Sequence, residues 1–149
     1  MDTRIIPDVV SGQTIRALRP EDSALDAARL MREHDISAIV VLDEDGMLAG
    51  IVTERDFARR VVAEDGRGSA LRLAQLMSAN PATIAASASP YDALEQMRKL
   101  RVRHLPVVEG GRVVGMISIR DLRHTIGAGR ELPRGILDRL RRAVSAFSR

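Results

Sequence analysis

The chain has 149 residues, 45% of them hydrophobic and 29% charged, which suits a soluble globular protein of one domain or two half-size units. It contains no cysteine, which excludes disulfides, thiolate metal sites and cysteine nucleophiles. Its formal net charge of +3 is concentrated in residues 123–149, which carry seven basic and two acidic side chains, and it is weak evidence for nucleic-acid binding.

The N-terminus, MDTRIIPDVV, carries neither the basic start nor the apolar stretch of a signal peptide. No segment of the sequence has about 18 consecutive apolar residues, the least that a transmembrane helix needs. The absence of cysteine fits a reducing compartment. These features predict a cytoplasmic protein.

A long internal repeat organises the sequence. The segment SALDAARLMREHDISAIVVLDEDGMLAGIVTERDF, which begins at Ser23, aligns with SPYDALEQMRKLRVRHLPVVEGGRVVGMISIRDL, which begins at Ser89. The second copy is one residue shorter in the turn. The alignment brings the octet GIVTERDF, residues 50–57, onto the octet GMISIRDL, residues 115–122. We therefore expect two copies of one structural unit.

Both copies predict the same order of elements. A short extended segment, 14–18 or 83–86, precedes a helix that begins at a capping box. The capping boxes are Ser23-x-x-Asp26 and Ser89-x-x-Asp92. An unbroken apolar run then predicts a buried strand, a Gly-containing turn predicts a hairpin, and the octet closes the returning strand and opens a second helix. Each unit is therefore β-α-β-β-α, which is too small to bury both faces of its sheet alone.

Two such units, each ending in Gly-φ-φ-[Ser/Thr]-x-x-Asp, resemble a pair of cystathionine β-synthase (CBS) domains, the tandem arrangement called a Bateman module. The resemblance covers about residues 5–126 and depends on the duplicated element order together with the motif. It implies an α/β (α+β) fold of two repeats packed face to face with pseudo-two-fold symmetry. The implied boundaries are 5–62 for the first domain, 63–72 for a linker, 73–126 for the second domain and 127–149 for a basic C-terminal helix.

The resemblance also implies a regulatory module rather than an enzyme. Such modules bind adenosine-containing ligands, namely AMP, ADP, ATP, S-adenosylmethionine or NAD(H), in clefts between the repeats, and need no further cofactor. They often form homodimers, and a separate protein effector would respond to the bound state. The sequence itself has no HExxH motif, no GxSxG elbow and no glycine-rich phosphate loop, and its three histidines lie on separate elements, so neither catalysis nor a metal site is expected.

The ends of the two octets carry the residues that favour a nucleotide site. Segments 53–56 and 118–121 lie where a strand ends and a helix begins, so free backbone N–H groups and the helix dipole would face an anion. A hydroxyl there can donate to a phosphate, an ionised aspartate can accept both hydroxyls of a ribose, and an arginine can reach the phosphates. The candidates in this motif are Thr53, Arg55, Asp56, Ser118, Arg120 and Asp121.

Further contacts are implied by the resemblance. Aliphatic residues would enclose the base, backbone groups of the early extended segments would contact the adenine edge, and the entries to the buried strands would line the clefts. These candidates are Ile51 and Met116 for the walls, Ala17 and Thr83 for the adenine edge, and Ser37, Ala38, Arg103 and His104 at the strand entries. A solvated surface charge at Arg103 and a packed strand histidine at His104 remain open alternatives.

Helix capping is the alternative function of the octet motif, because [Ser/Thr]-x-x-Asp is also a capping box. Capping alone accounts for the boxes at Ser23 and Ser89. The duplicated strand context and the resemblance favour ligand binding for the two octets. Glu54 of the first octet is replaced by Ile119 in the second, so we expect the second octet to bind a polyphosphate more tightly.

The C-terminal segment, residues 127–149, supports a further alternative. It predicts an amphipathic helix whose apolar residues pack on the same chain or on a second subunit. Its arginines also allow a nucleic-acid-binding or purely structural dimerisation protein, because basic helices bind phosphate backbones nonspecifically. The scarcity of aromatic residues, with one tyrosine, two phenylalanines and no tryptophan, argues against a stacking platform for single strands.

Overall fold

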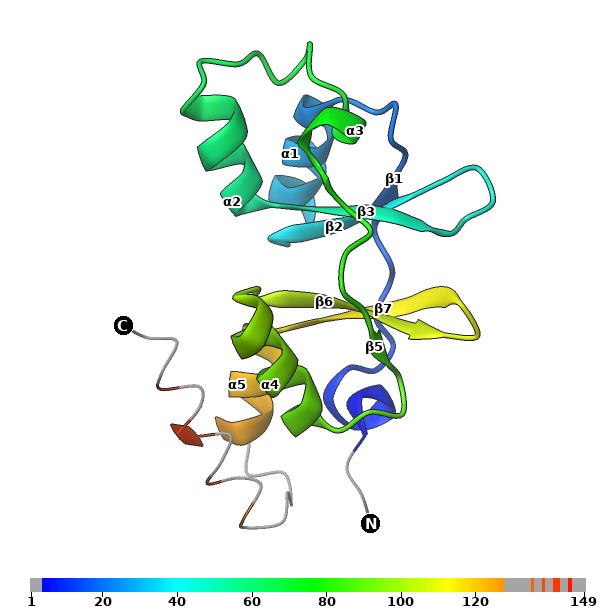
Figure 1. The fold of residues 1–149 in the computed structure, drawn as a ribbon, viewed down its shortest axis with the longest axis vertical. Helices are drawn as coiled ribbons and strands as arrows, with labels where there is room; N and C mark the ends of the chain where they lie inside the picture. The colour runs from blue at the N-terminus through cyan, green and yellow to red at the C-terminus, as the bar shows by residue number, and fades with distance from the viewer. Residues whose placement is uncertain (1–3, 128–134, 136–137, 139–140, 143–144, 146–149) are drawn as a thin grey trace. The chain divides into compact units, whose positions relative to one another are not determined.

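In the computed structural model the chain forms two units, each built around its own β-sheet (Figure 1). The structure describes residues 4–127 together with 135, 138, 141, 142 and 145. The first-repeat unit contains residues 15–81, and the second-repeat unit combines residues 4–14 with residues 82–127. The predicted α+β fold of two repeats is confirmed, while most of the predicted C-terminal helix lies outside the described residues.

The first-repeat unit contains a four-stranded sheet in the order β1-β2-β3-β4. Strand β1 is parallel to β2, and the other neighbours are antiparallel. The strands are β1 (Ala17–Leu18), β2 (Ala38–Leu42), β3 (Leu48–Thr53) and β4 (Ser78–Ala79). The helices are α1 (Ala24–His34), α2 (Glu54–Asp56), which continues into η2 (Phe57–Val62), and α3 (Leu73–Leu76).

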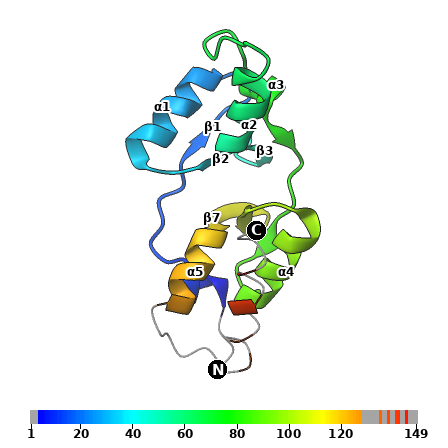
Figure 2. The same cartoon turned by 90° about the vertical axis from the view of Figure 1, so that its left-hand side faces the viewer.

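The second-repeat unit contains a three-stranded sheet in the order β5-β6-β7, with the same parallel and antiparallel pairings. Helices α4 and α5 lie side by side on one face of this sheet (Figure 2). The strands are β5 (Ile84–Ala85), β6 (His104–Glu109) and β7 (Arg112–Ser118). The helical segments are η1 (Ile5–Val9), α4 (Pro90–Leu100) and α5 (Ile119–Gly127).

Helices α1 and α4 begin at the two predicted capping boxes. The Ser23 hydroxyl accepts a hydrogen bond from the Asp26 N–H at 3.0 Å, and the Ser89 hydroxyl accepts one from the Asp92 N–H at 3.1 Å. In return, each aspartate accepts a bond from the backbone N–H of its serine. Backbone N–H groups that the helices themselves leave unpaired are satisfied in this way, so the boxes fix where both helices start.

The hairpin turns explain why the second copy is one residue shorter. Gly110 and Gly111 both have positive φ, 56° and 79°, which a two-residue turn between antiparallel strands requires. The first hairpin is longer and is organised by Asp43, whose Oδ1 accepts the N–H groups of Asp45 and Met47 at 3.0 and 2.9 Å. Different turn chemistry therefore closes the same pair of strands in the two units.

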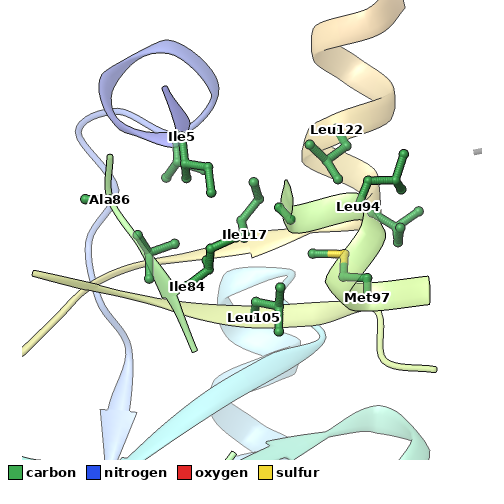
Figure 3. Packing of buried hydrophobic residues seen from close by; sticks show 12 residues of the cluster. Ile5, Ile84, Ala86, Leu94, Met97, Leu105, Ile117 and Leu122 are labelled. Atoms are coloured by element: carbon green, nitrogen blue, oxygen red, sulfur yellow. The ribbon is translucent and has the colours of Figure 1, made fainter. Parts of the chain in front are cut away.

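Each unit contains its own aliphatic cluster on the face of the sheet that the helices cover. In the second-repeat unit the cluster includes Leu94 and Met97 from α4, Leu105 from β6 and Ile117 from β7, each no more than 1% exposed (Figure 3). In the first-repeat unit the corresponding cluster includes Ala24, Ala27, Met31, Ile39, Val41, Val52, Leu73 and Leu76. Because the chain has almost no aromatic residues, both cores are formed by close packing of Ile, Leu, Val, Met and Ala.

The N-terminal segment packs on the second repeat, although the predicted boundary of 5–62 grouped it with the first. Ile5 is fully buried among Ile84, Ala86 and Ile117 (Figure 3), and its N–H donates to the Ala88 carbonyl at 2.9 Å. Val10 is 6% exposed in the same cluster. Ile5 and Val10 therefore complete the core of the second-repeat unit.

Helix α3, which precedes the second repeat in the sequence, packs on the first repeat. Leu73 is fully buried in the first-repeat cluster, and its N–H donates to the Asp22 carbonyl at 2.8 Å. The Ala74 N–H likewise donates to the Pro20 carbonyl at 2.9 Å. The predicted boundary of 73–126 grouped these residues with the second repeat. Each repeat is therefore completed by the segment that precedes the other repeat in the sequence.

The outer edges of β3 and β7 are closed by different means. In the first-repeat unit, strand β4 pairs with β3, with Ser78 opposite Ile51. In the second-repeat unit, the side-chain amide of Gln13 takes this place on β7. Its Oε1 accepts the Met116 N–H at 2.7 Å, and its Nε2 donates to the Met116 carbonyl at 3.2 Å. A single side chain thus imitates one residue of a neighbouring strand.

This difference predicts that alanine at the two octet glycines, Gly50 and Gly115, lowers the free energy of unfolding by unequal amounts. A Cβ at Gly50 would lie 2.5 Å from the Met77 Sδ and 2.9 Å from the Ser78 carbonyl, whereas at Gly115 the nearest atom would be the Gln13 Oε1 at 3.3 Å. Because a backbone carbonyl cannot move aside as a side-chain end can, we expect Gly50→Ala to cost about 1–3 kcal/mol. Gly115→Ala should cost clearly less. Urea unfolding of both variants measures these losses of stability. Equal losses would contradict the close approach of the Ser78 carbonyl to Gly50.

Candidate functional site

The candidate residues of the first octet gather where β2 begins and β3 ends. Ala38 lies directly opposite Thr53, and the Glu54 N–H donates to the Ser37 carbonyl at 3.1 Å. Two residues further along the strands, Val40 pairs with Ile51 on one side and with Ala17 of β1 on the other. We call this set the first site: Ala17, Ser37, Ala38, Ile51, Thr53, Arg55 and Asp56.

The second octet repeats this geometry within the second-repeat unit. His104 lies opposite Ser118, Pro106 lies opposite Met116, and the Ile119 N–H donates to the Arg103 carbonyl at 3.0 Å. Thr83 directly precedes β5. We call this set the second site: Thr83, Arg103, His104, Met116, Ser118, Arg120 and Asp121. The predicted site residues of each octet therefore lie in the strands of one sheet or close to their ends.

Strand alternation places the sites on the sheet faces that the helices leave uncovered. Ile39, Val41 and Val52 belong to the hydrophobic cluster shared with α1. Because side chains alternate along a strand, Ala38 and Thr53, which neighbour them, point to the opposite face. Leu105 and Ile117 have the same relation to His104 and Ser118 in the second-repeat unit. Each site is thus kept apart from its unit's helix-covered core.

Both octet aspartates cap the helix in which they lie. The Asp121 Oδ2 accepts the Ser118 N–H and the Ser118 hydroxyl, both at 2.7 Å. The Asp56 Oδ2 accepts the Thr53 N–H at 2.8 Å and the Thr53 hydroxyl at 3.2 Å. Within the described part of the chain, all of these bonds use Oδ2. Capping therefore leaves Oδ1 of each carboxylate with acceptor capacity for a ligand, so capping and binding are compatible.

Fewer backbone donors remain for an anion than the motif suggested. The Ser118 N–H is bound to Asp121, the Ile119 N–H to the Arg103 carbonyl, and the Asp121 N–H to the Ser118 hydroxyl at 3.2 Å. A phosphate at the second site would therefore depend mainly on side chains. Arg120 and Arg103 are both exposed and carry guanidinium groups suited to that contact.

Two glutamines that the sequence did not single out hold the backbone around the second site. Gln13 pairs with both main-chain groups of Met116, and the Gln96 Nε2 donates to the Thr83 carbonyl at 3.0 Å. One of the backbone groups expected to contact an adenine edge is therefore already bonded. Neither glutamine has a sequence signal, because its partner lies 103 or 13 residues away.

His104 is the one described residue whose titration is clearly altered by the site. Burial lowers the pKa of His104 below its usual value of 6.5, Arg103 lowers it further, and the Asp121 carboxylate partly offsets both effects. The imidazole is therefore neutral at pH 7. The charges of Asp121 and Arg103 both act on the His104 imidazole.

The lowered pKa of His104 predicts an acid-sensitive fold. Below pH 6.5 the unfolded chain binds a proton more readily than the folded chain, so stability is complete above that pH and is lost as the pH falls toward the folded pKa. The loss should be at most about 1.4 kcal/mol per pH unit. Urea midpoints at several pH values should show a smaller loss for His104→Gln than for wild type. His124, which is exposed, provides the control variant His124→Gln. If stability falls equally steeply with pH in wild type and in His104→Gln, the lowered pKa of His104 is not the cause of the acid sensitivity.

The described residues contain neither a candidate metal site nor a candidate membrane-spanning helix. No group of three or more His, Asp or Glu side chains in residues 4–127 could hold a metal ion. Among the helices that the structure describes, none combines the length and the apolar character needed to cross a bilayer.

Two copies of a β-α-β-β-α unit, each with a hydroxyl residue and an aspartate at the junction of its last strand and helix, define a tandem-repeat α+β module. The CBS domain family model matches residues 5–63 and 73–128. The chain therefore belongs to the CBS domain family.

Solved CBS structures share this fold. A putative signal-transduction protein with CBS domains from Burkholderia ambifaria MC40-6 is 37% identical, with a TM-score of 0.80, over 87% of this chain and 98% of that one. The CBS domain pair of protein MJ0100, in complex with 5′-methylthioadenosine and S-adenosyl-L-methionine, is 26% identical with a TM-score of 0.77, over 87% and 100% of the two chains. The CBS domain protein PAE2072 from Pyrobaculum aerophilum, complexed with AMP, is 26% identical with a TM-score of 0.72, over 86% and 92%.

Some relatives are much longer proteins. The chain spans only 18% and 21% of the length of two CBS domain-containing proteins from Arabidopsis thaliana, to which it is 35% and 34% identical over 97 and 115 residues.

Proposed function

We propose that the chain is a regulatory module that binds an adenosine-containing ligand at the first and second sites. The observation that carries the proposal is the state of the two octet aspartates. Each carboxylate is fixed by a cap through Oδ2 and retains Oδ1 as an acceptor beside a hydroxyl and an arginine. The relatives MJ0100 and PAE2072, which bind adenosyl ligands, support the choice of ligand class.

The chemistry of recognition follows from the position of each group. An ionised carboxylate accepts both hydroxyls of a ribose in charge-assisted hydrogen bonds, which are stronger than neutral ones. Ile51 and Met116, which lie opposite Val40 and Pro106 in the strand register, would form the apolar walls against a purine. Arg55 and Arg120 follow the hydroxyl residues and would contact the 5′ substituent.

The output of the module would be a change in conformation rather than a reaction. A ligand shifts a conformational equilibrium only when it has different affinities for the two states. We expect AMP, ADP, ATP, S-adenosylmethionine or NAD(H) to act in this way on a cytoplasmic homodimer, with a separate protein effector that responds to the bound form. No part of this proposal requires a catalytic group or a cofactor.

A thermal-shift panel tests the proposal. A ligand that binds only the folded chain at 100 times its Kd stabilises it by about 2.7 kcal/mol and raises Tm. AMP, ATP, S-adenosylmethionine and NADH are the probes, and ribose 5-phosphate is the control that lacks the base. A rise in Tm with at least one adenosyl compound and none with ribose 5-phosphate is expected. No shift with any adenosyl probe at millimolar concentration would overturn the proposed function.

A further inference from the structure

The two sites differ in charge at two of their positions. The first site has one carboxylate, Asp56, and one guanidinium, Arg55, and the carboxylate of Glu54 lies next to them in the sequence. The second site has the guanidiniums of Arg103 and Arg120 with one carboxylate, Asp121. Arg55 and Arg120 are equivalent, as are the two aspartates, so the difference lies at the remaining two positions.

Hydrogen bonding shows that these two positions meet at the same junction. In the first site, the Glu54 N–H is bonded to the Ser37 carbonyl at 3.1 Å. In the second site, the Ile119 N–H is bonded to the Arg103 carbonyl at 3.0 Å. A carboxylate beside an uncharged serine is therefore replaced by an apolar residue beside a guanidinium.

The burial of these residues decides which charges a ligand would meet. Ile119 is 7% exposed and belongs to the hydrophobic cluster, so it contributes no polar group to the second site. Glu54, directly after β3, and Arg103, directly before β6, are exposed, and the part of the chain that the structure describes contains no ion pair for either of them. Both charges are therefore available to act on a ligand at the adjacent motif.

We propose that the two sites sort adenosine ligands by charge. The second site takes adenine nucleotides with phosphate groups, and the first site takes adenosyl compounds whose 5′ substituent is uncharged or cationic. The physical reason is Coulombic, because a carboxylate within a few ångströms of the 5′ position repels phosphates and attracts a cation such as a sulfonium. Glu54 and Arg103 are the residues that determine this specificity. The inference depends on the proposed function, since it assigns ligand classes to the sites proposed there.

Calorimetry on the whole chain with three probes tests the sorting. ATP is the anionic probe, S-adenosylmethionine the cationic probe and 5′-methylthioadenosine the uncharged probe. Asp121→Asn isolates the first site, and Asp56→Asn isolates the second, because the amide oxygen can still accept the cap bonds while the second acceptor is lost. We expect the ratio of ATP affinity to S-adenosylmethionine affinity to be at least about tenfold higher at the second site.

Two charge-removing variants assign the effect to single residues. In the Asp121→Asn chain, Glu54→Gln should raise the ratio of ATP to S-adenosylmethionine affinity by about tenfold. In the Asp56→Asn chain, Arg103→Ser should lower it by a similar factor. Affinity for 5′-methylthioadenosine should change little in either variant. The controls are Glu44→Gln and Arg112→Ser, which lie in or beside the hairpin turns at the far ends of the same strands.

The outcomes separate the two proposals. Binding of all three probes with the same charge preference at both sites overturns the sorting and leaves the proposed function intact. The sorting is also overturned if the two charge-removing variants behave like their controls. Failure of every probe to bind the wild-type chain overturns the proposed function, and the sorting with it.

Discussion

Asp121→Ala is expected to weaken adenosine-ligand binding at the second site by at least about 100-fold. A carboxylate that accepts two ribose hydroxyls makes two charge-assisted hydrogen bonds, each worth about 1.5–3 kcal/mol, and a loss of 1.4 kcal/mol is a factor of ten. The same replacement removes the cap on the Ser118 N–H, which costs about 1 kcal/mol of stability. Calorimetry gives the first quantity and urea unfolding the second.

The chain contains a matched control for the capping contribution. Asp92 caps α4 in the same unit with nearly the same geometry, accepting the Ser89 N–H at 3.1 Å and the Ser89 hydroxyl at 2.7 Å. Asp92→Ala should therefore lower stability to a similar extent and leave ligand affinity unchanged. Asp121→Asn should keep much of the cap and still lose binding. If Asp121→Ala and Asp92→Ala have the same effect on affinity, the octet aspartate acts as a cap alone.

Ile5→Ala is the second replacement expected to have a large effect, with a loss of about 2–4 kcal/mol of unfolding free energy. Ile5 is fully buried among residues of β5 and β7, so its removal leaves a cavity that the cluster must collapse around (Figure 3). Val62→Ala, at a side chain that is 75% exposed, is the control and should change stability by less than about 0.5 kcal/mol.

Hydrogen exchange would show which strands are destabilised by the cavity in Ile5→Ala. The amides of β6 and β7 should lose protection in Ile5→Ala, because the segment belongs to the second-repeat cluster. Loss of protection confined to β2 and β3 would place the segment on the first repeat and contradict the fold described here. A change no larger than that of Val62→Ala would show that the segment does not complete a core at all.

Features that depend on neighbouring residues were predictable from the sequence. The capping boxes at Ser23 and Ser89 and the two-glycine turn at 110–111 act through side chains and φ angles within four residues, so their sequence signals are sufficient. Alignment of the two repeats predicted that the two octets are structurally equivalent. The positions of both sites at the ends of β3 and β7 follow from these local signals.

Features that depend on strand register or on distant packing were not predictable. Nothing local to Ile5 or Leu73 indicates on which sheet it packs, because an apolar segment fits either cluster by composition. The acceptors that engage the Glu54 and Ile119 N–H groups are carbonyls of Ser37 and Arg103, which are brought there by the hairpin register. For this reason the sequence overestimated the backbone donors left for a phosphate. The pairing of Gln13 with Met116 was missed on the same grounds.

A crystal structure of the chain soaked with AMP and S-adenosylmethionine tests the central claim most directly. Our account predicts an adenosyl ligand whose ribose hydroxyls lie within hydrogen-bond distance of Oδ1 of Asp121 or Asp56, while Oδ2 keeps its bonds to Ser118 or Thr53. Its base should pack against Met116 or Ile51. Electron density for the ligand elsewhere, or empty sites with both carboxylates bonded only to their own helices, would contradict the account.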